Sequence, residues 1–264
     1  MPKINLDYSK VKEKGPDNKI YTHNVLSKGD YNSFNPTALG LGNISQDGTY
    51  VQAIACFYDL EGFTSFSNQV DSHLVVPEFL KRFVDWLFQS LRESFKASES
   101  NEKVKIWGSL PFYTKFLGDG ILFLWDTDYS TGIHGMSNTI NLLHKICLRY
   151  QSEFLPEIRK HVSKPPSKLR CGVARGQIIS IGDGNDYVGS CINIASRLQK
   201  LSKLTFAISR RGLDLHNVSG HKYWQNFILK KVELRGIGDE ELIYIRKVEF
   251  DELSSKERKI FKDP

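Results

Sequence analysis

Two aspartates follow apolar segments of the chain, at positions where a folded sheet would hold their carboxylates rigidly. Asp59 comes directly after the run VQAIACFY, and Asp119 lies in a Gly-Asp-Gly turn between two apolar runs. Carboxylate oxygens are the ligands that Mg²⁺ and Mn²⁺ prefer, and two such ions can bind an attacking hydroxyl and a polyphosphate together. Either aspartate alone is compatible with an ordinary turn residue. Together they predict a metal site.

The turn after the first aspartate offers a place for phosphate. Glu61, Gly62, Phe63 and Thr64 form a glycine-containing turn that leads into a segment with helical periodicity. Because the free N–H groups of a helix N-terminus point at a bound anion, this turn and Asp59 together predict a pocket for phosphate and metal.

A second polar group lies downstream. Asp186, Asn193 and Arg197 follow one another at separations of seven and four residues. Asn193 and Arg197 therefore share one face of a helix, and a guanidinium beside an amide suits a polyphosphate and a ribose. Asp186 can accept hydrogen bonds from a base. The alternative interpretation of this segment is an exposed polar helix face.

The hydrophobic pattern predicts the elements that would position these residues. A nearly continuous apolar run indicates a buried strand over 51–60, and two runs around Gly-Asp-Gly indicate a hairpin over 111–125. Helical spacing predicts long helices over 72–96 and 131–155. Further along, the pattern predicts two strands over 168–184 with a bend at Gly176, a helix over 191–202, a strand over 204–209 and closing strands over 227–236 and 241–250. This order predicts an α/β (α+β) fold with a mixed, mostly antiparallel sheet and flanking helices.

Three regions of different composition are expected. Residues 1–50 are polar and lack apolar periodicity, which predicts an N-terminal extension, ordered at best in part around SFNPTALGLG. Residues 51–250 carry the apolar periodicity of one folded domain, which is also the one that holds the candidate catalytic residues, and residues 251–264 are expected to form a charged C-terminal tail. The whole chain is 40% hydrophobic and 25% charged, so a sizeable core is expected.

Composition also narrows the partners. No run of about 18 apolar residues occurs, so no membrane span is expected, and the start MPKINLDYSK lacks the apolar core of a signal peptide. We therefore expect a cytoplasmic protein. The net charge is +6, but the basic residues form no long run, so a nucleic-acid partner is not expected. The four cysteines form no CxxC pair, which favours buried free thiols over a zinc site.

Four segments in this order resemble the motifs of the class III nucleotidyl cyclases. FYDLEGFTSFS resembles their first metal motif and TKFLGDGILFLW their second. GVARGQIISIG with DYVGSCINIASRL resembles the third motif, and VELRGIGDEELIYI the closing strands. The resemblance covers residues 51–248 and implies the ferredoxin-like catalytic core of that family.

The resemblance implies a role for each matching residue of the first two motifs. Asp59 and Asp119 would bind two divalent metal ions, Mn²⁺ or Mg²⁺, with the carbonyl of Leu60 as a further ligand. The backbone of Gly62, Phe63 and Thr64 would wrap the phosphates of a nucleoside triphosphate.

The later motifs would supply the rest of the site. Lys115 and Asp186 match the two base-selecting positions of the family. Asn193 would orient the ribose, and Arg197 would stabilise the charge that builds on the α-phosphate. Arg235 stands where the family places a phosphate-binding lysine.

In this family two chains meet head to tail, and each site takes metal ligands from one chain and the base-selecting and transition-state residues from the other. Because this chain carries both sets, the resemblance implies a homodimer with two equivalent active sites. A binding-only domain that has lost cyclase activity is not expected.

The motifs point to two different bases. The pair Lys115 and Asp186 resembles the adenylate cyclases and disfavours GTP. The segment over 67–94, however, resembles the pyrimidine (uridylate or cytidylate) cyclases of bacterial Pycsar anti-phage defence. That family makes cyclic UMP or cyclic CMP, which activates a separate effector protein.

A pyrimidine is compatible with the base-selecting pair. A lysine ammonium can donate to O2 or O4 of the base, and an aspartate can accept from N3–H or from the C4 amine. A smaller base also leaves space to fill, and Tyr50, Phe57 and Tyr58 on the first strand are candidates for filling it. The alternative for these aromatic residues is plain core packing, which is favoured for Phe57. We therefore predict a cyclase for UTP or CTP. The alternatives are an adenylate cyclase, a polymerase-like nucleotidyltransferase, and a basic nucleic-acid-binding module.

Overall fold

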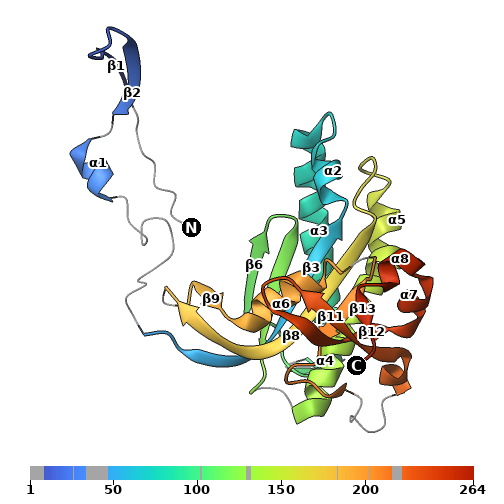
Figure 1. Ribbon diagram of the computed structural model, residues 1–264. Coiled ribbons are helices and arrows are strands. Elements are labelled where there is room, and N and C mark those ends of the chain that lie inside the picture. The colour runs from blue at the N-terminus through green and yellow to red at the C-terminus, as the bar shows by residue number, and fades with distance from the viewer. Residues whose placement is uncertain are drawn as a thin grey trace. The chain divides into compact units, whose positions relative to one another are not determined.

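The chain divides into two compact units in this computed structural model (Figure 1). The first consists of Met1–Val51 with Ile179–Val188, and the second of Gln52–Ile178 with Gly189–Pro264. The predicted extension therefore lies in the first unit, which also takes in Val51 and Ile179–Val188 of the expected catalytic domain. The structure describes residues 9–25, 27–33, 47–101, 103–128, 132–182, 184–201, 203–215 and 222–264.

The first unit contains a hairpin that the polar sequence did not suggest. Strand β1 (Ser9–Lys14) pairs with β2 (Ile20–Val25) in antiparallel register, and helix α1 (Lys28–Ser33) follows. Strand β9 (Asp186–Val188) pairs with the last residues of β8 (Lys168–Ile181). The stretch SFNPTALGLG, expected to be partly ordered, begins at Ser33, and the rest of it lies outside the described residues.

The second unit is built on a mixed sheet with the strand order β13-β11-β12-β10-β8-β3-β7-β6. β10 pairs with β8 in parallel, whereas β3 with β7, β6 with β7, and β11 with β12 are antiparallel. The strands are β3 (Tyr50–Glu61), β6 (Tyr113–Leu117), β7 (Gly120–Asp126), β10 (Phe206–Ser209), β11 (Phe227–Leu234), β12 (Gly238–Arg246) and β13 (Phe261–Lys262). The predicted mixed, mostly antiparallel α/β fold is confirmed.

Two long helices and several short helical segments pack against one face of this sheet and form the core with it (Figure 1). They are α2 (Phe63–Ser67), α3 (Ser72–Phe95) and α4 (Gly132–Arg149), the last continuing as a π-helical turn η1 (Tyr150–Phe154) and α5 (Leu155–Ile158). Every second residue of β3 joins this core, and the Tyr58 hydroxyl donates to the Leu143 carbonyl at 2.9 Å. Successive side chains of a strand point to opposite faces, so Phe57 and Asp59 lie on the other face.

Helix α6 (Ser190–Leu198) packs on that other face. Leu169, Cys171 and Val173 of β8 belong to the helical core, so Gly172 between them faces α6. A Cβ atom at Gly172 would lie 2.1 Å from the Ala195 carbonyl oxygen. The close approach of helix to strand therefore requires glycine here.

Two expectations about the chain are wrong. The segment expected to form two strands with a bend at Gly176 is the continuous strand β8, and this glycine instead faces α6, where a Cβ would lie 3.1 Å from Cys191 Cβ. The segment expected as a charged tail adds a strand to the sheet, because Phe261 of β13 pairs with Val232 of β11.

The C-terminal residues before β13 are also ordered into helices. They form α7 (Lys247–Glu252) and α8 (Ser255–Arg258), and Ser254 and Glu257 make a reciprocal capping box at the start of α8. Outside the site described below, the unit also contains β4 (Lys96–Glu99), β5 (Val104–Ile106) and the 3₁₀ turn η3 (Lys222–Asn226).

The expectations about thiols and membranes can be compared with the structure directly. All four cysteines are buried and free, as predicted. In the part of the chain that the structure describes, no helix is both long enough and apolar enough to cross a bilayer.

Candidate active site

The two predicted metal ligands lie next to each other at one end of paired strands. Asp59 on β3 is opposite Gly120 on β7, and the Leu60 N–H donates to the Asp119 carbonyl at 3.4 Å. Gly118 takes a φ of 72°, which glycine adopts without strain, and the tight turn that results places Asp119 beside the end of β3. The hairpin geometry thus brings the two carboxylate-bearing residues together.

Opposing effects act on the pKa of the Asp59 carboxyl, because this residue is only 1% exposed and lies near charges of both signs. Burial raises the pKa of its carboxyl above the ordinary value, and the negative charge of Asp119 adds to this effect. Hydrogen bonding and the positive charge of Arg170 oppose the rise, with a smaller contribution from Lys200. A carboxylate crowded by another carboxylate is stabilised by any cation that enters between them.

Arg170 is the functional candidate that sequence reasoning missed. Its Nε and Nη2 donate to Asp59 Oδ2 at 3.2 and 2.5 Å, and its Nη1 lies 3.9 Å from Glu61 Oε1. The signal was present in the run KLRCGVA, where an arginine interrupts an apolar strand. A charged residue at such a position rarely stays buried without a partner.

The expected phosphate turn follows β3 directly. Gly62 precedes α2 with a φ of 86°, and a Cβ there would meet no atom within 4 Å, so its backbone conformation rather than crowding favours glycine. The Phe63 ring packs against Phe66 and Phe79, and Thr64 is exposed. This turn leaves the backbone N–H groups of 63 and 64 at the start of α2, next to Asp59.

The predicted shared face of Asn193 and Arg197 is present on α6. Both side chains are exposed, whereas the buried residues of the helix are Cys191, Ile194, Ala195 and Leu198. Among the described residues, no hydrogen bond or ion pair joins Asn193 or Arg197 to Asp59 or Asp119.

The base-selecting candidates fall in different units. Lys115 lies in the second unit on the edge strand β6, opposite Leu122, which in turn is opposite Phe57 on β3. Residues directly opposite in a sheet share one face, so Lys115 and Phe57 are on the face that carries Asp59. Asp186 belongs to the first unit, where its Oδ1 accepts from the Tyr187 N–H at 2.9 Å.

Only one of the three aromatic candidates lies on the site face of the second unit. Phe57 is 6% exposed and its ring covers Gly120, where a Cβ would lie 2.2 Å from Phe57 Cε1. Tyr58 points into the helical core, so the expectation that it fills a nucleotide pocket is wrong. Tyr50 is 63% exposed and belongs to the first unit.

Arg235 lies in the turn that joins the closing strands. The Ile237 N–H donates to the Leu234 carbonyl at 2.8 Å across this turn, and Gly236 takes a φ of 78°. The side chain of Arg235 is exposed, which leaves its guanidinium accessible to an anionic group.

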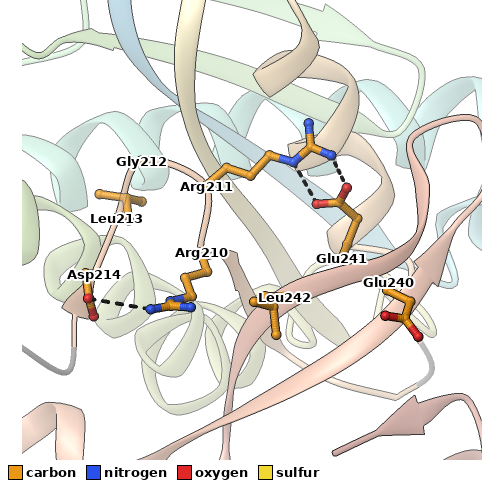
Figure 2. A pocket seen from close by; sticks show the side chains of 8 residues that line it. All are labelled: Arg210, Arg211, Gly212, Leu213, Asp214, Glu240, Glu241 and Leu242. Carbon is orange, nitrogen blue, oxygen red and sulfur yellow. Dashed lines mark hydrogen bonds and ion pairs between the residues drawn. The ribbon is translucent and has the colours of Figure 1, made fainter. Parts of the chain in front are cut away.

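A cavity of about 630 Å³ lies elsewhere on the second unit, beside the end of β10 and the start of β12 (Figure 2). Figure 2 shows the Arg211 side chain extended toward Glu241, and Arg211 Nε donates to Glu241 Oε2 at 2.8 Å. Arg210 Nη2 lies 3.7 Å from Asp214 Oδ2. Both arginines that line this cavity face carboxylates of the same cavity, and none of the predicted site residues lines the cavity. We therefore do not assign the cavity to the nucleotide.

Comparison with known proteins concerns the fold. No protein-family model matches this sequence, and no curated protein matches it. Among solved structures, the adenylyl cyclase CyaB from P. aeruginosa is 15% identical with a TM-score of 0.53, covering 76% of this chain and 96% of that chain. The guanylyl cyclase Cya2 is 18% identical with a TM-score of 0.54, covering 76% and 94%. The chain has the class III cyclase fold.

A light-regulated bacterial adenylyl cyclase is a further structural neighbour of the class III cyclase fold seen here. It is 16% identical with a TM-score of 0.51, covering 77% of this chain and 53% of that chain. The motifs quoted from the sequence lie in this fold on β3 and α2, on the hairpin β6–β7, on β8 through α6, and on the hairpin β11–β12.

Proposed function

We propose that this protein is a pyrimidine nucleotide cyclase, which converts UTP or CTP to the 3′,5′-cyclic monophosphate and pyrophosphate. The observation that carries the cyclase proposal is that Asp59 at the end of β3 lies beside Asp119 in the β6–β7 turn of a class III cyclase fold. The turn that follows Asp59 lies beside them and suits a triphosphate.

The chemistry of the two aspartates fits a pair of divalent cations. Both carry hard oxygen donors, and the hydrogen bond from the Leu60 N–H to the Asp119 carbonyl holds the two residues side by side. Asp59, Asp119 and the Leu60 carbonyl would hold Mn²⁺ or Mg²⁺. When bound, such ions acidify a hydroxyl and neutralise the charge of a leaving polyphosphate.

The other residues of the chain would bind and orient the substrate. In the reaction, the ribose 3′ oxygen forms a bond to the α-phosphorus, the bond to the bridging oxygen of the β-phosphate breaks, and pyrophosphate and a proton are released. Gly62, Phe63 and Thr64 would hold the phosphates through backbone N–H groups. Asn193 would orient the ribose, and the Arg197 guanidinium would stabilise the charge that builds in the transition state.

A homodimer would complete each site. Asn193 and Arg197 are exposed on α6, and the resemblance to the class III cyclases implies that a second chain supplies them to each site. Exposed apolar side chains on and before edge strand β6 support a covered surface there: Trp107, Leu110, Phe112, Phe116 and Leu117. Lys115 lies on the same strand.

The proposal of a pyrimidine rests on the resemblance of the segment after the first motif. The Phe57 ring packs over Gly120 on the face that carries Lys115. Lys115 can donate to O2 or O4 of a pyrimidine. The segment over 67–94, most of which lies in α3, resembles the Pycsar cyclases, which supports a cyclic pyrimidine messenger that activates a separate effector in anti-phage defence.

Product analysis tests both levels of this proposal. We would incubate the purified protein with Mn²⁺ and ATP, GTP, CTP or UTP separately and identify products by mass, with Asp119→Asn as the control. Cyclic UMP or cyclic CMP is the expected product. Cyclic AMP would refute the pyrimidine preference but retain the cyclase, and linear products would indicate a polymerase-like transferase. No cyclic product from a folded dimer would refute the cyclase.

A further inference from the structure

The residues that follow α6 cross the sheet beside the start of β8, on the face where α6 packs. A Cβ atom at Gly172 would lie 2.7 Å from the Gln199 nitrogen, so Gln199 lies over this strand. Farther along, the Lys168 ammonium donates to the Lys203 carbonyl at 3.1 Å, which ties the segment to the first residue of β8. Lys200 lies between these two anchors.

The two anchors place Lys200 beside the proposed metal site. Arg170 lies on the same face of β8 as Gly172, because successive side chains of a strand alternate between faces. From there Arg170 donates to the Asp59 carboxylate. The positive charge of Lys200 opposes the rise in the pKa of the Asp59 carboxyl, which agrees with this placement. An ammonium group therefore lies within electrostatic reach of a predicted metal ligand.

The backbone of Lys200 is held in place, whereas its side chain remains available. Gln199 and Leu201 on either side are buried, and the Lys200 N–H donates to the Arg197 carbonyl at 3.1 Å. The residue itself is exposed, and across the part of the chain that the structure describes its ammonium makes no hydrogen bond or ion pair. A cation held in this way can contact an anionic ligand.

The charge balance of the proposed site favours a further cation there. Two divalent metal ions would balance the charge of a nucleoside triphosphate, and the carboxylates of Asp59 and Asp119 would then remain as excess negative charge. Arg170 supplies one positive charge beside Asp59, and Lys200 supplies another from the same side of the sheet. A lysine ammonium is a compact point charge that suits phosphate oxygens.

From this geometry we propose that Lys200 binds the triphosphate of the substrate. The inference rests on the proposed function, in which Asp59 and Asp119 hold the metal, and it adds a phosphate-binding residue to that site. No motif of the sequence marked this lysine, because the third motif ends at Leu198.

Binding of inorganic tripolyphosphate tests the inference without catalysis, because this probe has no ribose to react. Its preformed Mn²⁺ complex would be titrated calorimetrically into wild type, Lys200→Gln and the control Lys203→Gln. The control removes a neighbouring lysine whose Nζ lies 3.4 Å from Glu257 Oε1. We expect Lys200→Gln to weaken tripolyphosphate binding about tenfold, because hydrogen bonds to charged groups are stronger than neutral ones. The control should match wild type.

A second variant and the salt dependence separate a phosphate contact from damage to the fold. Lys200→Arg keeps the positive charge and should bind tripolyphosphate nearly as tightly as wild type. The affinity of Lys200→Gln should fall less steeply with added KCl than that of wild type, because one charged contact is missing. Equal binding by Lys200→Gln and wild type overturns the proposal, as does an equal loss in Lys200→Arg or Lys203→Gln. Absence of tripolyphosphate binding to wild type also overturns it.

Phosphate binding and catalysis can fail separately in these experiments. If no nucleotide yields a cyclic product but Lys200→Gln still loses affinity for tripolyphosphate, the cyclase assignment fails and the phosphate-binding role of Lys200 stands. If cyclic product forms but Lys200→Gln binds tripolyphosphate as wild type does, the role of Lys200 fails and the cyclase stands.

Discussion

Substitution of Gly172 by alanine tests how α6 is held against the sheet. A Cβ at this position would lie 2.1 Å from the Ala195 carbonyl oxygen, 2.7 Å from the Gln199 nitrogen and 2.9 Å from Leu198 Cβ. The two closest contacts are to backbone atoms, which cannot rotate away as a side-chain tip can. The helix or the strand must therefore shift to admit a single methyl group.

The expected cost follows from the nature of these contacts. Overpacking of a well-packed interior costs about 1–3 kcal/mol, and backbone partners place Gly172→Ala near the upper limit. In a unit of this size about 3 kcal/mol corresponds to a fall in melting temperature of roughly 6–12 °C. Because α6 carries Asn193 and Arg197, its displacement should also lower kcat.

Thermal unfolding followed by circular dichroism measures the effect. The matched control is Gly176→Ala on the same strand, where the added Cβ would lie 3.1 Å from Cys191 Cβ, so a much smaller displacement than at Gly172 relieves the contact. We expect the control to lose less than about 1 kcal/mol. If the melting temperature of Gly172→Ala equals that of wild type, or is no lower than that of Gly176→Ala, the close contact between α6 and β8 is refuted.

Three further predictions concern the site and the core. Arg197→Ala should lower kcat by about a hundredfold with little change in KM, because the guanidinium acts in the transition state; an unchanged kcat in steady-state assays would contradict this role. Asp119→Asn should abolish turnover while the variant stays folded, measured by product formation and circular dichroism, and activity near wild type would remove Asp119 from the metal site. Burial lowers the pKa of His144 to about 3, whereas the unfolded chain takes up this proton near pH 6.5. Stability contributed by neutral His144 is therefore present above pH 6.5 and falls by about 1.4 kcal/mol per unit below it, about 2 kcal/mol at pH 5. Urea unfolding should show that the free energy of unfolding falls less between pH 7 and pH 5 in His144→Gln than in wild type. An equal fall in both proteins would contradict a buried, neutral His144.

The sequence alone was sufficient for features that depend on local pattern. The apolar run over 51–60 predicted β3, and the Gly-Asp-Gly turn predicted the hairpin that carries Asp119, because a short-range turn conformation and a two-residue alternation define both. The spacing of Asn193 and Arg197 predicted their common exposed face, since helical periodicity alone decides it.

Only the tertiary structure decided contacts between distant segments. Arg170 and Asp59 are 111 residues apart, and nothing in either local pattern names the other as its partner. The sequence predicted a bend at Gly176, whereas the structure shows that this glycine lies where α6 packs on β8. The charged C-terminal segment forms β13, which pairs with β11. Tyr58 lies next to Asp59 in sequence yet points into the helical core, because which face of a strand is buried depends on what packs against it.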